Sequence, residues 1–172
     1  MMQYFWGSRG CGFVVTLLVA SVMLGPTQVL VAQESDGVSE AGLLAAPPAE
    51  WLTTGRDFAE TRYSPLDQID VDNIEELGLA WSWMIPKSGA RLEATPVVSD
   101  GVMYATGPKS FVFALDARTG EKQWQWDPGI PGGREGGPSV CCGEVNRGVA
   151  LYGGKVFVGL LDGRLVALDR ET

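Results

Sequence analysis

Short apolar runs separated by turn sequences dominate the second half of the chain. Three such runs lie at residues 94–98, 102–106 and 111–115, an alternating polar and aromatic segment follows at 122–126, and each of the four has five residues. The segments between them contain glycine, proline, serine and aspartate, which tight turns favour. Runs of this length and composition, bounded by such turns, predict four short antiparallel strands.

The same pattern occurs a second time further along the chain. Residues 100–119 (DGVMYATGPKSFVFALDART) align without gaps on residues 153–172 (GGKVFVGLLDGRLVALDRET), at an offset of 53 residues. Asp162-Gly163 in the second copy is a strong signal for a hairpin turn. Four antiparallel strands in a repeat of roughly 40–50 residues are typical of a β-propeller blade, so the predicted class is all-β.

A spaced motif, Ala-x-Asp-x-x-Thr-Gly-x-x-x-Trp, joins the third predicted strand to the fourth at residues 114–124. Asp116 can accept hydrogen bonds from the turn amides, and Gly120 can supply a positive φ. Ala114 is small enough to let another blade approach. Trp124 offers a flat indole that can stack on a neighbouring blade and donate its N–H to a backbone carbonyl.

The residues before these strands have a different character. Residues 33–50 are polar and contain prolines, which predicts a linker or an N-terminal arm. Asp70 is a candidate N-cap for a short helix over 71–77 that ends at Gly78. The aromatic segment 79–85 follows and predicts a strand in which Trp81 and Trp83 have packing roles.

The first 32 residues have the order of a secretory signal peptide. A single positive charge at Arg9 precedes an apolar run of about 14 residues, and small residues and an acidic stretch follow. The run is shorter than the roughly 20 residues that a membrane-spanning helix needs. We therefore expect export to a bacterial periplasm, with a retained N-terminal anchor as the alternative interpretation.

Composition excludes several classes of function. The chain has no histidine, which rules out a Ser-His-Asp triad, a Cys-His pair and a Cys-x-x-Cys-His haem attachment among these residues. Its net charge of −8 argues against binding nucleic acid, because no basic stripe is present to neutralise phosphates. Of the three cysteines, Cys11 lies in the predicted signal, so the mature chain would keep only Cys141 and Cys142.

These two adjacent cysteines have three possible uses. A disulfide between neighbours closes a strained ring that contributes almost nothing by loop closure, so its value would lie in a rigid, flat, polarizable surface. An exported chain meets an oxidising compartment in which such a bond can persist. The alternatives are two buried thiols that act as small hydrophobes, or a reactive thiol in a flexible loop.

Two motifs resemble those of a known family. The motif at 114–124 is similar to the tryptophan-docking motif of the eight-bladed quinoprotein dehydrogenases, which use pyrroloquinoline quinone (PQQ). CCGEVNRG at 141–148 is similar to the segment that covers the cofactor in PQQ alcohol dehydrogenases. The resemblance implies a vicinal disulfide between Cys141 and Cys142 that stacks on one face of the quinone. It also implies that Arg147 contacts one of the three PQQ carboxylates, which a guanidinium suits well.

A third candidate cofactor residue is Glu93. Its segment, RLEATPVV at 91–98, resembles the start of the first blade, where a family glutamate hydrogen-bonds to the cofactor. Family members often carry a glycine on each side of that glutamate, whereas this chain has Leu92 and Ala94.

The resemblance covers nearly all of the expected mature chain and implies its organisation. Residues 50–70 resemble the family's opening segment, so 51–172 would be the start of a PQQ-type propeller. Its parts would be a closing strand near 79–85, a first blade over 93–126 and a partial second blade over 147–172. No catalytic base or metal ligand is assigned, because in the family these groups come from later blades.

The implied function is that of a periplasmic enzyme that oxidises alcohols to aldehydes. A base would take the hydroxyl proton, a hydride would pass to PQQ, and Ca²⁺ or a lanthanide would polarise the quinone carbonyl. Electrons would then pass to a cytochrome c. We expect the 172 residues to be the N-terminal part of this enzyme and to be inactive alone.

Two other functions compete with this one. A non-enzymatic assembly scaffold can be built from PQQ-like repeats, but it would need neither the cysteine pair nor Asn146-Arg147. A glucose-type quinoprotein is the other alternative, and the cysteine pair argues against it by resemblance.

Overall fold

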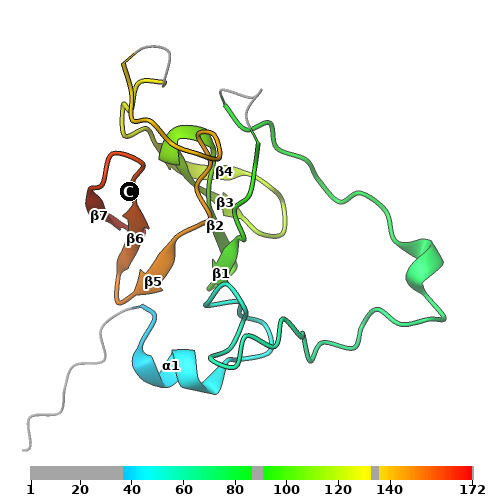
Figure 1. The fold of residues 1–172 in the computed structure, drawn as a ribbon. Helices are drawn as coiled ribbons and strands as arrows, with labels where there is room; N and C mark the ends of the chain where they lie inside the picture. The colour runs from blue at the N-terminus through cyan, green and yellow to red at the C-terminus, as the bar shows by residue number, and fades with distance from the viewer. Residues whose placement is uncertain (1–36, 87–90, 133–135, 172) are drawn as a thin grey trace, which may run out of the picture. The chain divides into compact units, whose positions relative to one another are not determined.

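The computed structural model describes residues 37–86, 91–132 and 136–171, and these residues form two antiparallel sheets (Figure 1). The predicted signal peptide over 1–32, with Arg9 and Cys11, lies outside the described residues. Within the described ranges, no helix has both the length and the apolar character needed to cross a membrane.

The first sheet contains four strands in sequence order. They are β1 (Val97–Ser99), β2 (Val102–Thr106), β3 (Val112–Asp116) and β4 (Lys122–Trp126), and each pairs antiparallel with its neighbour. The predictions for β2 and β4 are confirmed, and β3 begins one residue later than predicted. Strand β1 is shorter than the predicted 94–98, because Thr95 N–H donates to the carbonyl of Arg147 (3.3 Å) instead of pairing within the sheet.

The second sheet repeats the first. Its strands are β5 (Ala150–Tyr152), β6 (Lys155–Gly159) and β7 (Leu165–Asp169), again in sequence order and antiparallel. Tyr104 pairs with Ala114 in the first sheet, and Phe157 pairs with Ala167 in the second. These pairs are related by the offset found in the sequence, so the repeat preserves strand register. The predicted hairpin is confirmed, with Gly163 at φ 89°.

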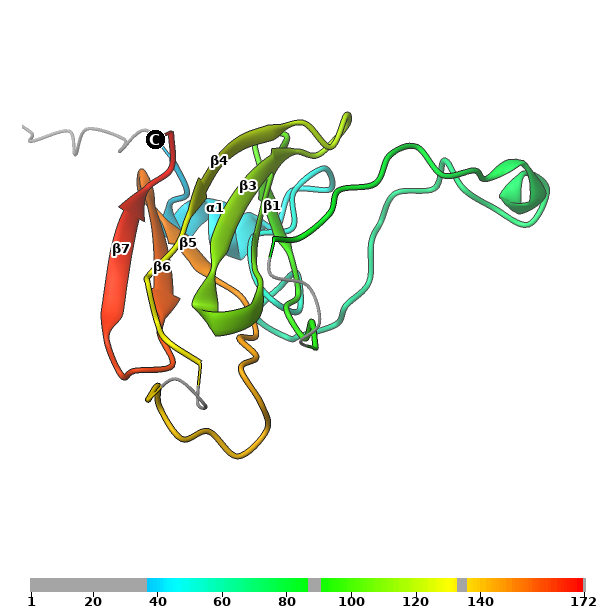
Figure 2. The same ribbon diagram turned by 90° about the horizontal axis from the view of Figure 1, so that it is seen from above.

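The two sheets stack face to face, with the main hydrophobic core between them (Figure 2). Alternate residues of each strand point into this core, as the twofold side-chain period of a strand requires. The first sheet contributes Val97, Tyr104, Val112 and Ala114, and the second contributes Leu151, Val156 and Val158. Ala114 is fully buried in this core, as expected for a small residue that lets another blade approach.

The predicted docking role of Trp124 is confirmed. Its indole packs against the core between the sheets, and its Nε1–H donates to the carbonyl of Arg170 at 2.7 Å. In the preceding turn, the carboxylate of Asp116 accepts from the backbone N–H groups of Arg118 and Thr119 and from the Thr119 hydroxyl. The hydrogen bonds from Thr119 lower the pKa of Asp116. Gly120 has φ 73°, as predicted.

The opposite face of the first sheet is covered by an extended segment. Trp81, Trp83 and Ile85 pack against Phe113 and its apolar neighbours, and the Trp83 and Phe113 rings lie 4.7 Å apart between centroids. The predicted strand over 79–85 is wrong, because this segment contacts the sheet through side chains and pairs with no described strand edge. The packing roles of both tryptophans are confirmed. A part for this segment in closing a propeller ring stays a prediction.

Two short helical segments differ from expectation. Residues 40–45, within the predicted arm, form helix α1 (Glu40–Ala45), whose N-cap Ser39 accepts from Gly42 N–H at 3.1 Å. The predicted helix over 71–77 is wrong, because only a single 3-10 turn, η1 (Ile74–Glu76), forms there. The Asp70 carboxylate binds the N–H groups just after it, and Val71 is 89% exposed, so no packing stabilises a longer helix.

Gly120 should be the least replaceable glycine of the first sheet's turns. A methyl group at this position would overlap the Trp81 indole in addition to requiring a positive φ. Gly101 has a similar φ of 75° but open space around it, so Gly101→Ala is the matched control. We expect Gly120→Ala to lower the free energy of unfolding by about 1–3 kcal/mol more than Gly101→Ala, measured by urea denaturation followed by circular dichroism. Equal losses would contradict the close contact.

Candidate functional site

The connection between β4 and β5 contains three of the four residues predicted to bind a cofactor. These are Cys141, Cys142 and Arg147, and the fourth, Glu93, lies just before β1. The connection runs from the first sheet to the second, so its position depends on how the two sheets stack (Figure 1).

Glu93 and Arg147 form an ion pair across 54 positions of sequence. Nη2 of Arg147 donates to Oε2 of Glu93 at 3.0 Å. The side chain of Arg147 is 73% exposed and that of Glu93 is 31% exposed. An exposed ion pair contributes little to stability, since its attraction is screened by water. The pair therefore leaves a guanidinium that solvent and a ligand can both reach.

The two cysteines lie in a turn, and both are exposed free thiols with their Sγ atoms 2.8 Å apart. Their exposure excludes the interpretation as buried small hydrophobes. The predicted disulfide is not formed in this structure and stays a prediction, with the sulfur atoms already in contact.

Electrostatics links the four predicted residues. The hydrogen bond with the Cys141 thiol raises the pKa of the Cys142 thiol, and the negative charge of Glu93 adds to the effect. The positive charge of Arg147 acts in the opposite direction and lowers the same pKa. A charge on Arg147 or Glu93 therefore acts on the Cys142 thiol, which links the ion pair to the cysteine turn.

The sequence did not indicate the contacts of two residues that hold this site together. The side-chain amide of Asn146 donates to Oγ of Ser110 at 3.0 Å and to the carbonyl of Gly159 at 2.8 Å. Asn146 belongs to the Asn-Arg-Gly motif, but the motif does not indicate that Ser110 and Gly159 are its hydrogen-bond partners. Ser110 carried no signal, because a serine in a turn between two strands is ordinary.

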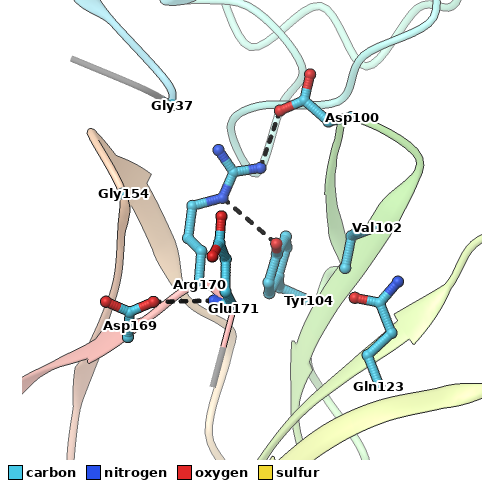
Figure 3. Close-up of a pocket in the computed structure, with 9 residues that line it drawn as sticks. All are labelled: Gly37, Asp100, Val102, Tyr104, Gln123, Gly154, Asp169, Arg170 and Glu171. Atoms are coloured by element: carbon cyan, nitrogen blue, oxygen red, sulfur yellow. Dashed lines mark hydrogen bonds and ion pairs between the residues drawn. The ribbon is translucent and has the colours of Figure 1, made fainter.

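A separate cleft of about 550 Å³ lies where the two sheets meet near Arg170 (Figure 3). Arg170 donates from Nε to the Tyr104 hydroxyl at 3.3 Å and from Nη2 to Asp100 at 3.0 Å, and its guanidinium lies 5.6 Å from the centre of the Tyr104 ring. The backbone carbonyl of the same residue accepts from Trp124. Arg170 therefore contacts the first sheet both through its side chain and through its backbone carbonyl.

No cluster of three or more histidine, cysteine, aspartate or glutamate side chains that could hold a metal ion is found within residues 37–86, 91–132 and 136–171. The expectation that metal ligands come from other parts of the protein stays a prediction.

Comparison with known proteins identifies the family. The β-propeller domain of the PQQ-dependent glucose, ethanol and alcohol dehydrogenases matches residues 51–172. The chain belongs to this family. The all-β propeller class and the sequence resemblance are thereby confirmed, and the two stacked sheets correspond to propeller blades.

Individual members of the quinoprotein family are similar over most of the chain. A 1-butanol dehydrogenase (cytochrome c) of Thauera butanivorans is 58% identical over 127 residues, which are 74% of this chain and 18% of that protein. The structure of quinohemoprotein alcohol dehydrogenase ADHIIG of Pseudomonas putida has a TM-score of 0.73 and 52% identity over 78% of this chain and 20% of that one. A europium-containing methanol dehydrogenase has a TM-score of 0.64 and 34% identity over 75% of this chain and 22% of that one. The chain thus spans about a fifth of the length of these relatives.

The cysteine pair of this quinoprotein chain should show opposite responses to two substitutions. In the reduced chain, Cys141→Ala removes the group that raises the pKa of Cys142, so more thiolate is present and alkylation by iodoacetamide at pH 8 becomes faster. Arg147→Gln removes the charge that lowers that pKa, so alkylation becomes slower. Peptide mapping by mass spectrometry gives the rate at Cys142 alone. Unchanged rates in both variants would show that the four residues do not form one electrostatic site.

Proposed function

We propose that this chain is the N-terminal part of an exported PQQ-dependent alcohol dehydrogenase that oxidises alcohols to aldehydes. The observation that carries the proposal is an ion pair next to two adjacent exposed cysteines. Arg147 and the cysteines lie in the connection between two propeller blades, and Glu93 reaches Arg147 from the segment before β1. Membership of the quinoprotein family supports the same conclusion.

The residues present suit PQQ. The cofactor is a flat tricarboxylate, and Arg147 offers an exposed guanidinium whose N–H groups match a carboxylate in geometry and charge. Glu93 holds that guanidinium in place and offers a carboxylate acceptor of its own. The contacting sulfur atoms of Cys141 and Cys142 offer a polarizable surface for an aromatic face. In this proposal the cysteines, joined by a disulfide, cover one face of PQQ while Arg147 and Glu93 lie at its rim.

When bound, PQQ supplies the acceptor for the hydride of the alcohol. The described residues bind and orient the cofactor, and we assign no catalytic base among them. We propose Ca²⁺ or a lanthanide as the accompanying metal, held by residues outside this chain. The similarity to a europium-containing methanol dehydrogenase supports the lanthanide as one of the two options.

The partners proposed for the whole protein are a small alcohol and a cytochrome c that accepts electrons. A relative named as a cytochrome c-linked 1-butanol dehydrogenase, 58% identical, supports both. These relatives favour an alcohol over glucose and an enzyme over an assembly scaffold. Nucleic acid is not proposed, since the net charge is −8. The signal-like pattern of residues 1–32 supports export to the periplasm.

The whole protein, loaded with PQQ and Ca²⁺ or a lanthanide, should reduce a redox dye when 1-butanol is added. Arg147→Gln removes a charged partner of the cofactor and should weaken PQQ binding by about 10–100-fold, measured by titration of the apoprotein. The separate 172-residue chain should be inactive, because two blades cannot enclose a central cofactor. Sustained dye reduction by that chain, or none by the whole protein, would overturn the proposal.

Intact-mass spectrometry of protein from a periplasmic extract should find a chain that begins near Gln33. Its mass should be about 2 Da below that of the fully reduced protein and should rise by this amount after treatment with dithiothreitol, because a disulfide lacks two hydrogens. The variant Cys142→Ser should show no such rise. A full-length N-terminus would favour the retained anchor, and two free thiols would remove the disulfide from the proposed site.

A further inference from the structure

Ser110 and Asn146 form a three-way junction between the two sheets and the segment that carries the site. Oγ of Ser110 accepts from the Asn146 amide at 3.0 Å and from Leu161 N–H at 3.3 Å. The same amide donates to the carbonyl of Gly159, at the end of β6. We call this set of contacts the Ser110–Asn146 junction. It connects the β2–β3 turn, the β4–β5 connection and the β6–β7 hairpin.

The junction fixes the backbone on both sides of Arg147. The Thr106 hydroxyl donates to the carbonyl of Asn146 at 3.2 Å, and Gly148 N–H donates to Oδ1 of Asn146 at 3.1 Å. Closer to the cysteines, Lys109 N–H donates to the carbonyl of Glu144 at 2.8 Å. The backbone around Arg147 is therefore held while its guanidinium stays exposed. The fixed backbone limits the positions that the Arg147 guanidinium can reach. None of these backbone contacts uses the N–H groups of the guanidinium.

The β2–β3 turn contains backbone strain at the junction itself. Helix η2 (Pro108–Ser110) has Lys109 at φ 57° and Ser110 at φ 60°, a left-handed conformation that costs a residue other than glycine about 1–2 kcal/mol. Ser110 is also fully buried. Strain of this kind persists only where surrounding contacts hold it, and it is concentrated at functional positions.

The second blade provides an internal comparison. At the repeat offset, Ser110 corresponds to Gly163, which has φ 89° in the β6–β7 hairpin. A glycine adopts this conformation without strain, and Asp162, which corresponds to Lys109, has no positive φ, so the turn of the second blade has the lower conformational cost. What Ser110 has and Gly163 lacks is the side-chain oxygen that accepts from Asn146 and Leu161. The strained turn of the first blade is thus explained by that oxygen.

We propose that Ser110 and Asn146 are positioning residues that orient Arg147 toward the cofactor, an inference that rests on the proposed function. Neither residue needs to touch PQQ. Removing Oγ of Ser110 leaves one amide N–H of Asn146 and the Leu161 N–H without their partner. The segment 141–148 then loses one of its attachments to the first blade, while the contacts with Thr106 and Lys109 remain.

The test uses the whole apoprotein and three serine variants. Ser110→Ala removes the oxygen and keeps the strain, whereas Ser110→Gly removes the oxygen and relieves the strain. Ser99→Ala is the matched control, because Ser99 is also buried in the first sheet and its hydroxyl donates only to neighbouring Asp100. Two quantities are measured: PQQ affinity by titration, and amide hydrogen exchange of the peptide 141–149 by mass spectrometry.

We expect both Ser110 variants to bind PQQ about tenfold more weakly and to exchange about tenfold faster over 141–149, with Ser99→Ala unchanged in both. Ser110→Gly should unfold at a higher urea concentration than Ser110→Ala despite the same loss of affinity. In an Arg147→Gln background, Ser110→Ala should have no further effect on PQQ affinity, because Ser110 acts through Arg147. If Ser110 had a purely structural role, the losses of PQQ affinity in the two variants would add, and they would follow the losses of stability to urea.

Equal exchange in Ser110→Ala and Ser99→Ala, or additive losses with Arg147→Gln, would overturn the positioning role. The proposed function fails on a different result. In that case the unsubstituted protein binds no PQQ, while amide hydrogen exchange over 141–149 still differs between Ser110→Ala and Ser99→Ala.

Discussion

The docking of one sheet on the next is the constraint on which the other features of this chain depend. Trp124 donates across the interface to the carbonyl of Arg170, and a core of valines, Tyr104 and Leu151 fills the space between the sheets. Neither sheet could bury this face alone, because a two-layer arrangement needs a second apolar surface. The site follows from the docking, since Arg147, Asn146 and the cysteines lie in the connection between the two layers.

The division of labour within the site follows from burial. Ser110 is buried and makes contacts that fix the backbone, whereas Arg147 and both cysteines are exposed. Buried hydrogen bonds are costly to break, so they suit the task of holding geometry. Exposed groups keep their donors and polarizable atoms accessible to a ligand. In this molecule, buried residues therefore fix the backbone of the site, and exposed residues present the groups that a ligand can contact.

Much of the fold was predictable because the repeat and the turn motif have local physical causes. Strand β2 has Val102 and Tyr104 two residues apart, and β4 alternates glutamine with Trp124 and Trp126, which is the side-chain period of a strand. The roles of Asp116, Gly120 and Trp124 follow from turn chemistry and indole geometry. The errors at 71–77 and 79–85 arose where a local pattern had no packing partner or no strand edge. The cofactor residues depended on resemblance to the quinoprotein family. Ser110 could not be predicted, since its role comes from contacts with residues 36 and 51 positions away.

The Glu93–Arg147 ion pair has a consequence for the order of folding. Its two charges belong to opposite sides of the first blade in sequence, and the junction that fixes Arg147 includes Gly159 and Leu161. Loop closure over this separation must precede any gain from the contact. The first blade is therefore complete in sequence before the residues that fix the guanidinium follow. On the proposed function, cofactor affinity and blade docking are linked equilibria, because a ligand that binds the docked state stabilises it by mass action.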